Sequence, residues 1–84
     1  MNGFIKQMIN QKLNHLTPEQ LLQLAKQYDL SITPRQAEQI TAILRRHQIN
    51  IADDRQRKQI LQEISAEVDP AIAKKIQALF QQFL

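Results

Sequence analysis

A pattern of helix, extended link and helix occurs twice in this chain, in overlapping copies between Leu16 and Ala52. Glu19-Gln20-Leu21 returns nineteen positions later as Glu38-Gln39-Ile40, and Leu30-Ser31-Ile32 returns as Ile49-Asn50-Ile51. Each link alternates apolar and polar residues, which is typical of an extended backbone that buries two side chains. We therefore expect two helix–extended link–helix units that overlap and share the third helix of the chain.

Strong helix-start signals divide the rest of the chain. Thr17-Pro18-Glu19-Gln20 and Thr33-Pro34-Arg35-Gln36 each place a capping hydroxyl before a first-turn Pro, with the Gln of a capping box at the third helical position. Asp53 or Asp54 caps a fourth helix, and Asp69-Pro70 opens a fifth. We predict that the second helix turns Leu21, Leu24, Ala25 and Tyr28 inward and that the third ends near His47.

The first helix is predicted from about Gly3 to Asn14, because Ile5, Ile9 and Leu13 fall on one stripe with Met8 beside it. Asn14 would end it in the left-handed conformation, which Asn tolerates best after Gly. The fold class is therefore all-α, a compact bundle of five short helices, and residues 1–84 form a single helical domain. The two three-residue links would be able to pair as a minimal ladder.

Composition excludes several classes of protein. The chain has no Cys, which excludes a disulfide scaffold, a Cys-based zinc site and thiol catalysis, and suits a reducing compartment. No apolar run approaches the ~18 residues that span a bilayer, and the N-terminus lacks the apolar core of a signal peptide. We expect a cytoplasmic protein without a membrane partner. A net charge of +3 permits an anionic partner without arguing for one.

Catalytic and metal-binding patterns are missing from the sequence. It contains no Gly-rich phosphate loop, nucleophile elbow or Cys/His pair. His15 and His47 have no other metal ligands at suitable spacing. We therefore predict no enzyme, no metal and no cofactor. His47 stands where Tyr28 stands in the first copy, so a part-buried ring that closes each loop is expected.

Two surfaces are candidates for binding. The first is a basic region that flanks the second link: Arg45, Arg46, Arg55, Arg57 and Lys58. Its last three members fall in the first turn of a helix, where each positive charge is disfavoured by ~0.3–1 kcal/mol. Such a cluster would suit nucleic-acid phosphate, an acidic protein surface or anionic lipid. The simpler interpretation, a solvated helix start with local ion pairs, is favoured.

The second candidate is the wide apolar face of the fifth helix: Ile72, Ile76, Leu79, Phe80 and Phe83. Core packing is the simpler interpretation of this face. Any part of it that stays exposed would serve as a surface for a partner helix or for a homodimer.

Leu16 to Leu44 resembles the SAP-type helix–extended loop–helix motif. The matching positions are Leu16-Thr17, Leu21, Leu24, Leu30, Ile32, Thr33, Ala37, Glu38 and Ile40. The resemblance implies two roughly parallel helices joined by an extended loop, a shape often used on DNA. The family usually has Gly followed closely by Lys at the start of its second helix, where this chain has Pro34 and Gln36. The resemblance therefore concerns shape more than activity.

Over its whole length the chain is also similar to a small uncharacterised family from low-GC, spore-forming Gram-positive bacteria. Four stretches carry this similarity: Met8–Leu13, Leu16-Thr17, Gln36–Ile40 and Asn50–Arg55. The family supplies no site or activity. Our leading hypothesis is a small non-enzymatic interaction or adaptor module with a protein partner, or a homodimer. The alternative is a nucleic-acid-binding protein of SAP-like shape that uses residues 45–58 on phosphates.

Overall fold

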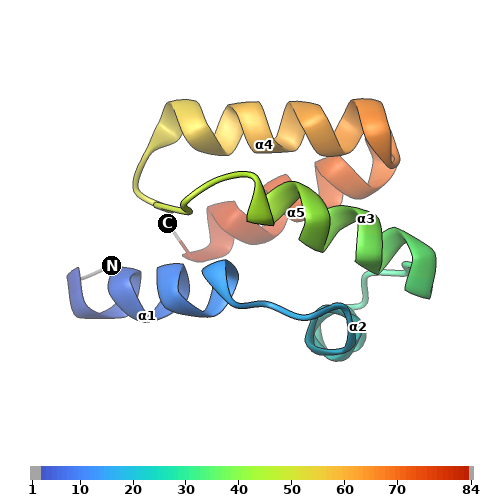
Figure 1. The fold of residues 1–84 in the computed structure, drawn as a ribbon, viewed down its shortest axis with the longest axis horizontal. Coiled ribbons are helices and arrows are strands. Elements are labelled where there is room, and N and C mark those ends of the chain that lie inside the picture. Colours follow the sequence, from blue (N-terminus) through green and yellow to red (C-terminus); the bar gives the residue numbers. More distant parts are fainter. Residues whose placement is uncertain (1–2, 84) are drawn as a thin grey trace.

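Five α-helices make up the computed structural model, which describes residues 3–83 except for the side chains of Lys6 and Phe83. They are α1 (Gly3–Asn14), α2 (Pro18–Gln27), α3 (Pro34–Arg45), α4 (Asp54–Glu67) and α5 (Pro70–Phe83) (Figure 1). Residues 3–83 contain no strand, and none of these helices is long and apolar enough to cross a bilayer. The predicted all-α fold, with a third helix shared by two units, is confirmed.

The α3 helix is the centre of the arrangement. It packs against α1, α2 and α4, and α4 in turn packs along α5 (Figure 1). The core contains Ile40 and Ile43 of α3 and Ile64 of α4, which are almost fully buried. Leu16, Leu44, Ile49, Ile60, Ile72 and Ala73 complete this cluster. The apolar positions of both links, Leu30 and Ile32 in one and Ile49 and Ile51 in the other, are buried or half-buried as their alternation predicts.

Both predicted capping boxes form. The Thr33 hydroxyl accepts the Gln36 N–H at 3.1 Å, and the Gln36 side chain accepts the Thr33 N–H at 2.9 Å. Thr17 and Gln20 make the same pair of bonds. Asp53 is the residue that caps α4. These contacts reach only three residues along the chain, which explains why the sequence predicts the helix starts.

The end of α1 differs from the prediction. Asn14 is its last residue but is not left-handed; among residues 3–83, a positive φ occurs at Asp29, at 59°, just after α2. The Asn14 side chain instead bonds to the backbone of Ile49, 35 residues away. Asn14 was therefore correctly placed at the helix end, but its expected conformation was wrong.

The helix pair α2–α3 also departs from expectation. Figure 1 shows α2 nearly end-on while α3 lies lengthwise, so the two helices cross steeply and are not the parallel pair that the SAP resemblance implies. The two links form no ladder within the described chain. Because α2 packs only against α3, one neighbour covers only part of its apolar stripe. Leu24 and Tyr28, predicted to point inward, are exposed, and Tyr28 is 42% exposed.

Candidate functional surfaces

The five cations of the predicted basic region do not form one patch. Arg46, at the end of α3, donates to both carboxylate oxygens of Glu67 at 2.7 Å and to Glu63 at 3.3 Å. This carboxylate pair raises the pKa of Arg46, and the Arg46 hydrogen bonds lower the pKa of Glu67. At 1.5 Å per residue, the contact lies roughly 13 Å along α4 from the Arg55–Lys58 turn.

Two more of these cations are paired at the start of α4. Arg57 contacts Asp54 at 2.8 Å and donates to the carbonyl of Ile51, and Lys58 contacts Asp54 at 3.3 Å. Asp54 therefore offsets the unfavourable positive charge in this first turn. Arg45 and Arg55 are exposed, and no ion pair within the described chain involves them.

The rings of His47 and Tyr28, each expected to close a loop, differ in burial. His47 is half-buried, and its Nε2 lies 3.0 Å from a Glu63 carboxylate oxygen, so this ring does close its loop against α4. Tyr28, at the equivalent position, stays exposed, and α2 packs against no helix other than α3 within the described chain. The described residues contain no cluster of three or more His, Asp or Glu side chains suited to a metal ion.

Most of the predicted α5 face belongs to the core. Ile72 is buried, and Ile76 packs against the core cluster. Leu79 and Phe80 are half-buried, and the side chain of Phe83 lies outside the described part of the structure. The portion left for a partner is therefore confined to the last turns of α5.

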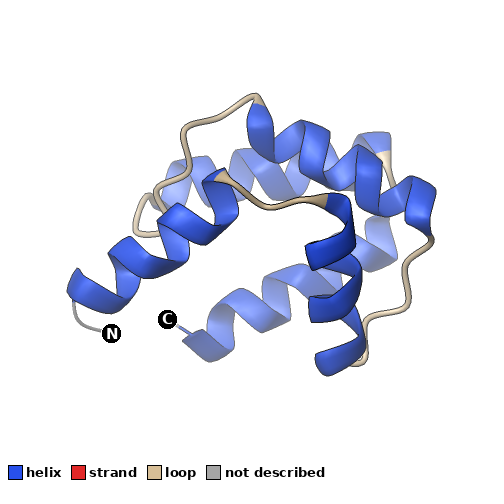
Figure 2. Ribbon diagram, turned by 60° about the horizontal axis from the view of Figure 1, so that its bottom comes forward, coloured by secondary structure: helices blue, strands red, loops and turns tan. Residues whose placement is uncertain are grey.

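A larger exposed apolar surface lies on α1, where the sequence predicts an apolar stripe of Ile5, Ile9 and Leu13 with Met8 beside it. Phe4 is 71% exposed, Ile5 43% and Met8 48%; we call these three residues the α1 face. Among the helices α1 packs against α3 alone, and Leu13 near its end reaches the core cluster. Figures 1 and 2 both place the start of α1 and the end of α5 at the same end of the molecule.

The second extended link is held by amide side chains from α1. Asn14 Oδ1 accepts the Ile49 N–H at 2.7 Å, and Asn14 Nδ2 donates to the Ile49 carbonyl at 3.2 Å. One helical turn earlier, Asn10 Oδ1 accepts the Ile51 N–H at 2.7 Å. The polar side of α1 thus pairs with this link much as a neighbouring strand would.

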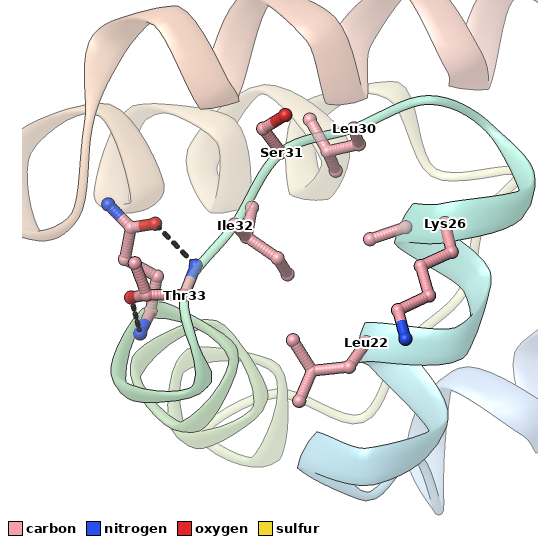
Figure 3. A pocket seen from close by; sticks show the side chains of 8 residues that line it. Leu22, Lys26, Leu30, Ser31, Ile32 and Thr33 are labelled. Carbon is pink, nitrogen blue, oxygen red and sulfur yellow. Dashed lines mark hydrogen bonds between the residues drawn. The ribbon is translucent and has the colours of Figure 1, made fainter.

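The first extended link has no such partner. The Leu30 N–H donates to the Ala25 carbonyl at 2.8 Å, and the Thr33 N–H belongs to the capping box of α3. Between them, the N–H groups of Ser31 and Ile32 make no hydrogen bond within residues 3–83. Figure 3 shows this link beside α2, where a hollow of about 340 Å³ opens between them.

The whole chain, residues 1–84, matches the family described as "Protein of unknown function (DUF2624)". It is also similar to "Uncharacterized protein YqfT" of Bacillus subtilis (strain 168), with 31% identity over 78 residues that cover 93% of each chain. No solved structure matches the chain. The similarity to a small uncharacterised family of low-GC Gram-positive bacteria is thereby confirmed: the chain belongs to the DUF2624 family.

Proposed function

We propose that this protein is a small non-enzymatic interaction module whose α1 face binds an acidic amphipathic helix of a partner protein. The observation that supports the proposal is the exposure of three large apolar side chains, Phe4, Ile5 and Met8, within two turns. Together they expose about 300 Å² of largely apolar surface, already the size of the largest patch on many monomeric proteins, and such patches often mark interaction sites.

The charge of α1 selects the kind of partner. The α1 helix carries two lysines, Lys6 and Lys12, and contains no acidic residue. An apolar helix face bordered by carboxylates would complement this surface in both shape and charge. A second copy of the chain fits less well, because it would bring the same lysine-bearing helix to the interface.

Nucleic-acid binding, the alternative function, has less support. Phosphate groups would have to displace the carboxylates that already contact Arg46, Arg57 and Lys58. Arg45 and Arg55 remain for direct phosphate contact. Two such contacts would contribute only a shallow salt dependence, since the log–log slope is about −0.9 per neutralised phosphate.

The test uses two labelled 18-residue helical peptides in fluorescence anisotropy titrations. Both have Leu at positions i, i+3, i+4 and i+7; one carries Glu at the remaining positions and its twin carries Lys. The protein is compared with Phe4→Ser/Met8→Ser and with a matched control on the same helix, Gln7→Ser/Gln11→Ser. Circular dichroism at 222 nm establishes that each variant is folded.

We expect the Glu peptide to bind more tightly than the Lys peptide, and the double α1-face variant to lose at least tenfold in affinity. That loss corresponds to about 1.4 kcal/mol, which is less than the free energy gained by burying one aromatic side chain. Equal affinity of the α1-face and control variants would refute the proposal. If sedimentation shows a dimer that the α1-face variant no longer forms, the α1 face binds a second copy of the chain and not a partner helix. Salt-steep binding to random duplex DNA that Arg45→Ala/Arg55→Ala abolishes would instead favour the alternative function.

A further inference from the structure

We propose that the first extended link, Leu30 to Thr33, is a second docking site, which takes an extended peptide strand from a partner. The peptide would pair its main chain with Ser31, place an apolar side chain in the adjoining hollow, and present an acidic side chain to Lys26. This site lies on α2 and the link, apart from the α1 face, so it does not depend on the function proposed above.

The second copy of the repeat shows how the backbone N–H and carbonyl groups of such a link can be hydrogen-bonded. In that link each successive N–H meets an amide oxygen: Ile49 donates to Asn14, Asn50 to Gln56, and Ile51 to Asn10, at 2.7–2.8 Å. Its carbonyls are engaged as well, because Ile49 accepts from Asn14 and Ile51 accepts from Arg57. The N–H groups of this extended link thus all bond to side-chain amides.

The first link presents the equivalent backbone without those partners. The N–H groups of Ser31 and Ile32 correspond to those of Asn50 and Ile51, and neither is bonded within the described chain. The nearby Gln36 amide is already committed to the capping box with Thr33 (Figure 3). A peptide carbonyl is the same kind of acceptor as the Asn and Gln amides of the second link. Because successive N–H groups of an extended segment point to opposite sides, an added strand would supply the missing oxygen to Ser31, the counterpart of Asn50, as in other cases of β-strand addition.

The hollow beside the link provides a place for a side chain. Figure 3 shows Leu22 of α2 and Ile32 of the link pointing into the space between the two segments. Ala25, Leu30 and the stem of Lys26 complete its apolar lining. Its volume of about 340 Å³ lies at the lower end of the range for ligand pockets, about 300–1,000 Å³. That size fits an apolar peptide side chain with part of its backbone.

The charge beside the hollow determines which second side chain the peptide should carry. Lys26 lies along its rim, is exposed, and makes no ion pair among residues 3–83. No Asp or Glu lines the hollow. In a strand, residues i and i+2 point to the same side. A peptide that alternates, with an apolar residue at i and an acidic residue at i+2, would therefore address the hollow and Lys26 together.

The test uses a fluorescein-labelled eight-residue peptide in which Leu–Gln–Glu–Gln is repeated, so that Leu and Glu share one face. Ser31→Pro removes the Ser31 N–H, whereas the control Ser31→Ala keeps it. Lys26→Glu reverses the charge at the rim, and Lys74→Glu, an exposed lysine on α5, is the matched control. A ¹⁵N-HSQC titration of the wild-type protein monitors the Ser31 and Ile32 amides directly and does not depend on how well the Pro variant folds.

We expect Ser31→Pro and Lys26→Glu each to weaken binding about tenfold, the effect of losing one good hydrogen bond or charge pair. Ser31→Ala, Lys74→Glu and the α1-face variant should stay within twofold of wild type. The Ser31 and Ile32 amide signals should shift on titration. Equal losses in Ser31→Ala and Ser31→Pro would overturn the proposal, and so would shifts confined to residues of α1. Because the α1-face variant is included, failure here and failure of the proposed function give different results.

Discussion

Asn14 provides the most direct test of how this fold is held together. Its side-chain amide forms two hydrogen bonds with the backbone of Ile49, one accepted at 2.7 Å and one donated at 3.2 Å. Ile49 is 6% exposed, so water cannot readily replace a lost partner. Asn14→Ala removes both bonds at once and leaves a buried N–H and carbonyl unpaired.

The size of the effect follows from these contacts. Two hydrogen bonds contribute about 1 kcal/mol each, and the unpaired groups add a desolvation penalty of about 1 kcal/mol. Ala favours the helix over Asn by up to ~0.7 kcal/mol, which offsets part of this loss. The free energy of unfolding should therefore fall by about 2 kcal/mol. With an m-value of about 1 kcal/mol per molar urea for a small protein, the urea midpoint moves down by about 2 M.

The measurement is urea denaturation followed by circular dichroism at 222 nm. The control is Gln11→Ala, an exposed residue of the same helix that makes no hydrogen bond through its side chain within the described chain. It changes helix propensity in the same direction without removing a contact, so its midpoint should stay near that of the wild type. The reasoning is refuted if Asn14→Ala lies within ~0.5 kcal/mol of this control, the usual spread for surface substitutions.

Three further predictions concern the core, a helix cap and pH. Ile64 is 1% exposed, so Ile64→Ala should cost ~3–4 kcal/mol in denaturation, and a cost no larger than that of the exposed Leu24→Ala would contradict its place in the core. Thr33→Ala should destabilise the protein by about 1 kcal/mol through loss of the α3 cap, whereas Thr33→Ser should retain most of it; equal losses would argue against capping. Arg46 hydrogen bonds lower the pKa of Glu67 below its ordinary 4.5, so the Glu67 contribution is present above that pH and is lost as the pH falls through the lower folded-state pKa. The stability difference between wild type and Glu67→Gln should accordingly shrink in acid. A difference that is constant from neutral pH to pH 3 would show that the Glu67 carboxylate does not stabilise the fold through Arg46.

The parts of this fold that could be predicted from sequence depend on contacts between close neighbours. A capping box links residues three apart, so the starts of α2 and α3 are visible in Thr17-Pro18 and Thr33-Pro34. The end of α1, in contrast, also involves a distant group. Asn14 looks like a helix terminator by itself, and only the folded chain shows that its amide bonds to Ile49. Nothing near Asn14 in the sequence carries that information.

The candidate surfaces were harder to predict for a related reason. A helical stripe shows that one side of a helix is apolar, but not how much of that side a neighbour covers. Ile5 and Met8 therefore fall on the predicted apolar side of α1 but are exposed, because α3 is the only helix that α1 packs against within the described chain. Likewise, counting charges near the second link cannot show that Arg46 turns away to contact Glu67 near the end of α4.

The exposure of the α1 face follows from the way in which α1 is held in place. The helix is positioned largely by polar contacts, because Asn10 and Asn14 pair with the backbone of the second link while its apolar residues reach the core mainly near its end, at Leu13. A helix held in this way does not need to bury its first turns, so Phe4 and Met8 can remain exposed without loss of the contacts that fix α1. The same amides that close the second link thus leave an apolar face open at one end of the molecule. No helix supplies the corresponding amides to the first link. The repeat therefore leaves two different exposed features, an apolar helix face on α1 and the N–H groups of Ser31 and Ile32 in the first link, which are unpaired within residues 3–83.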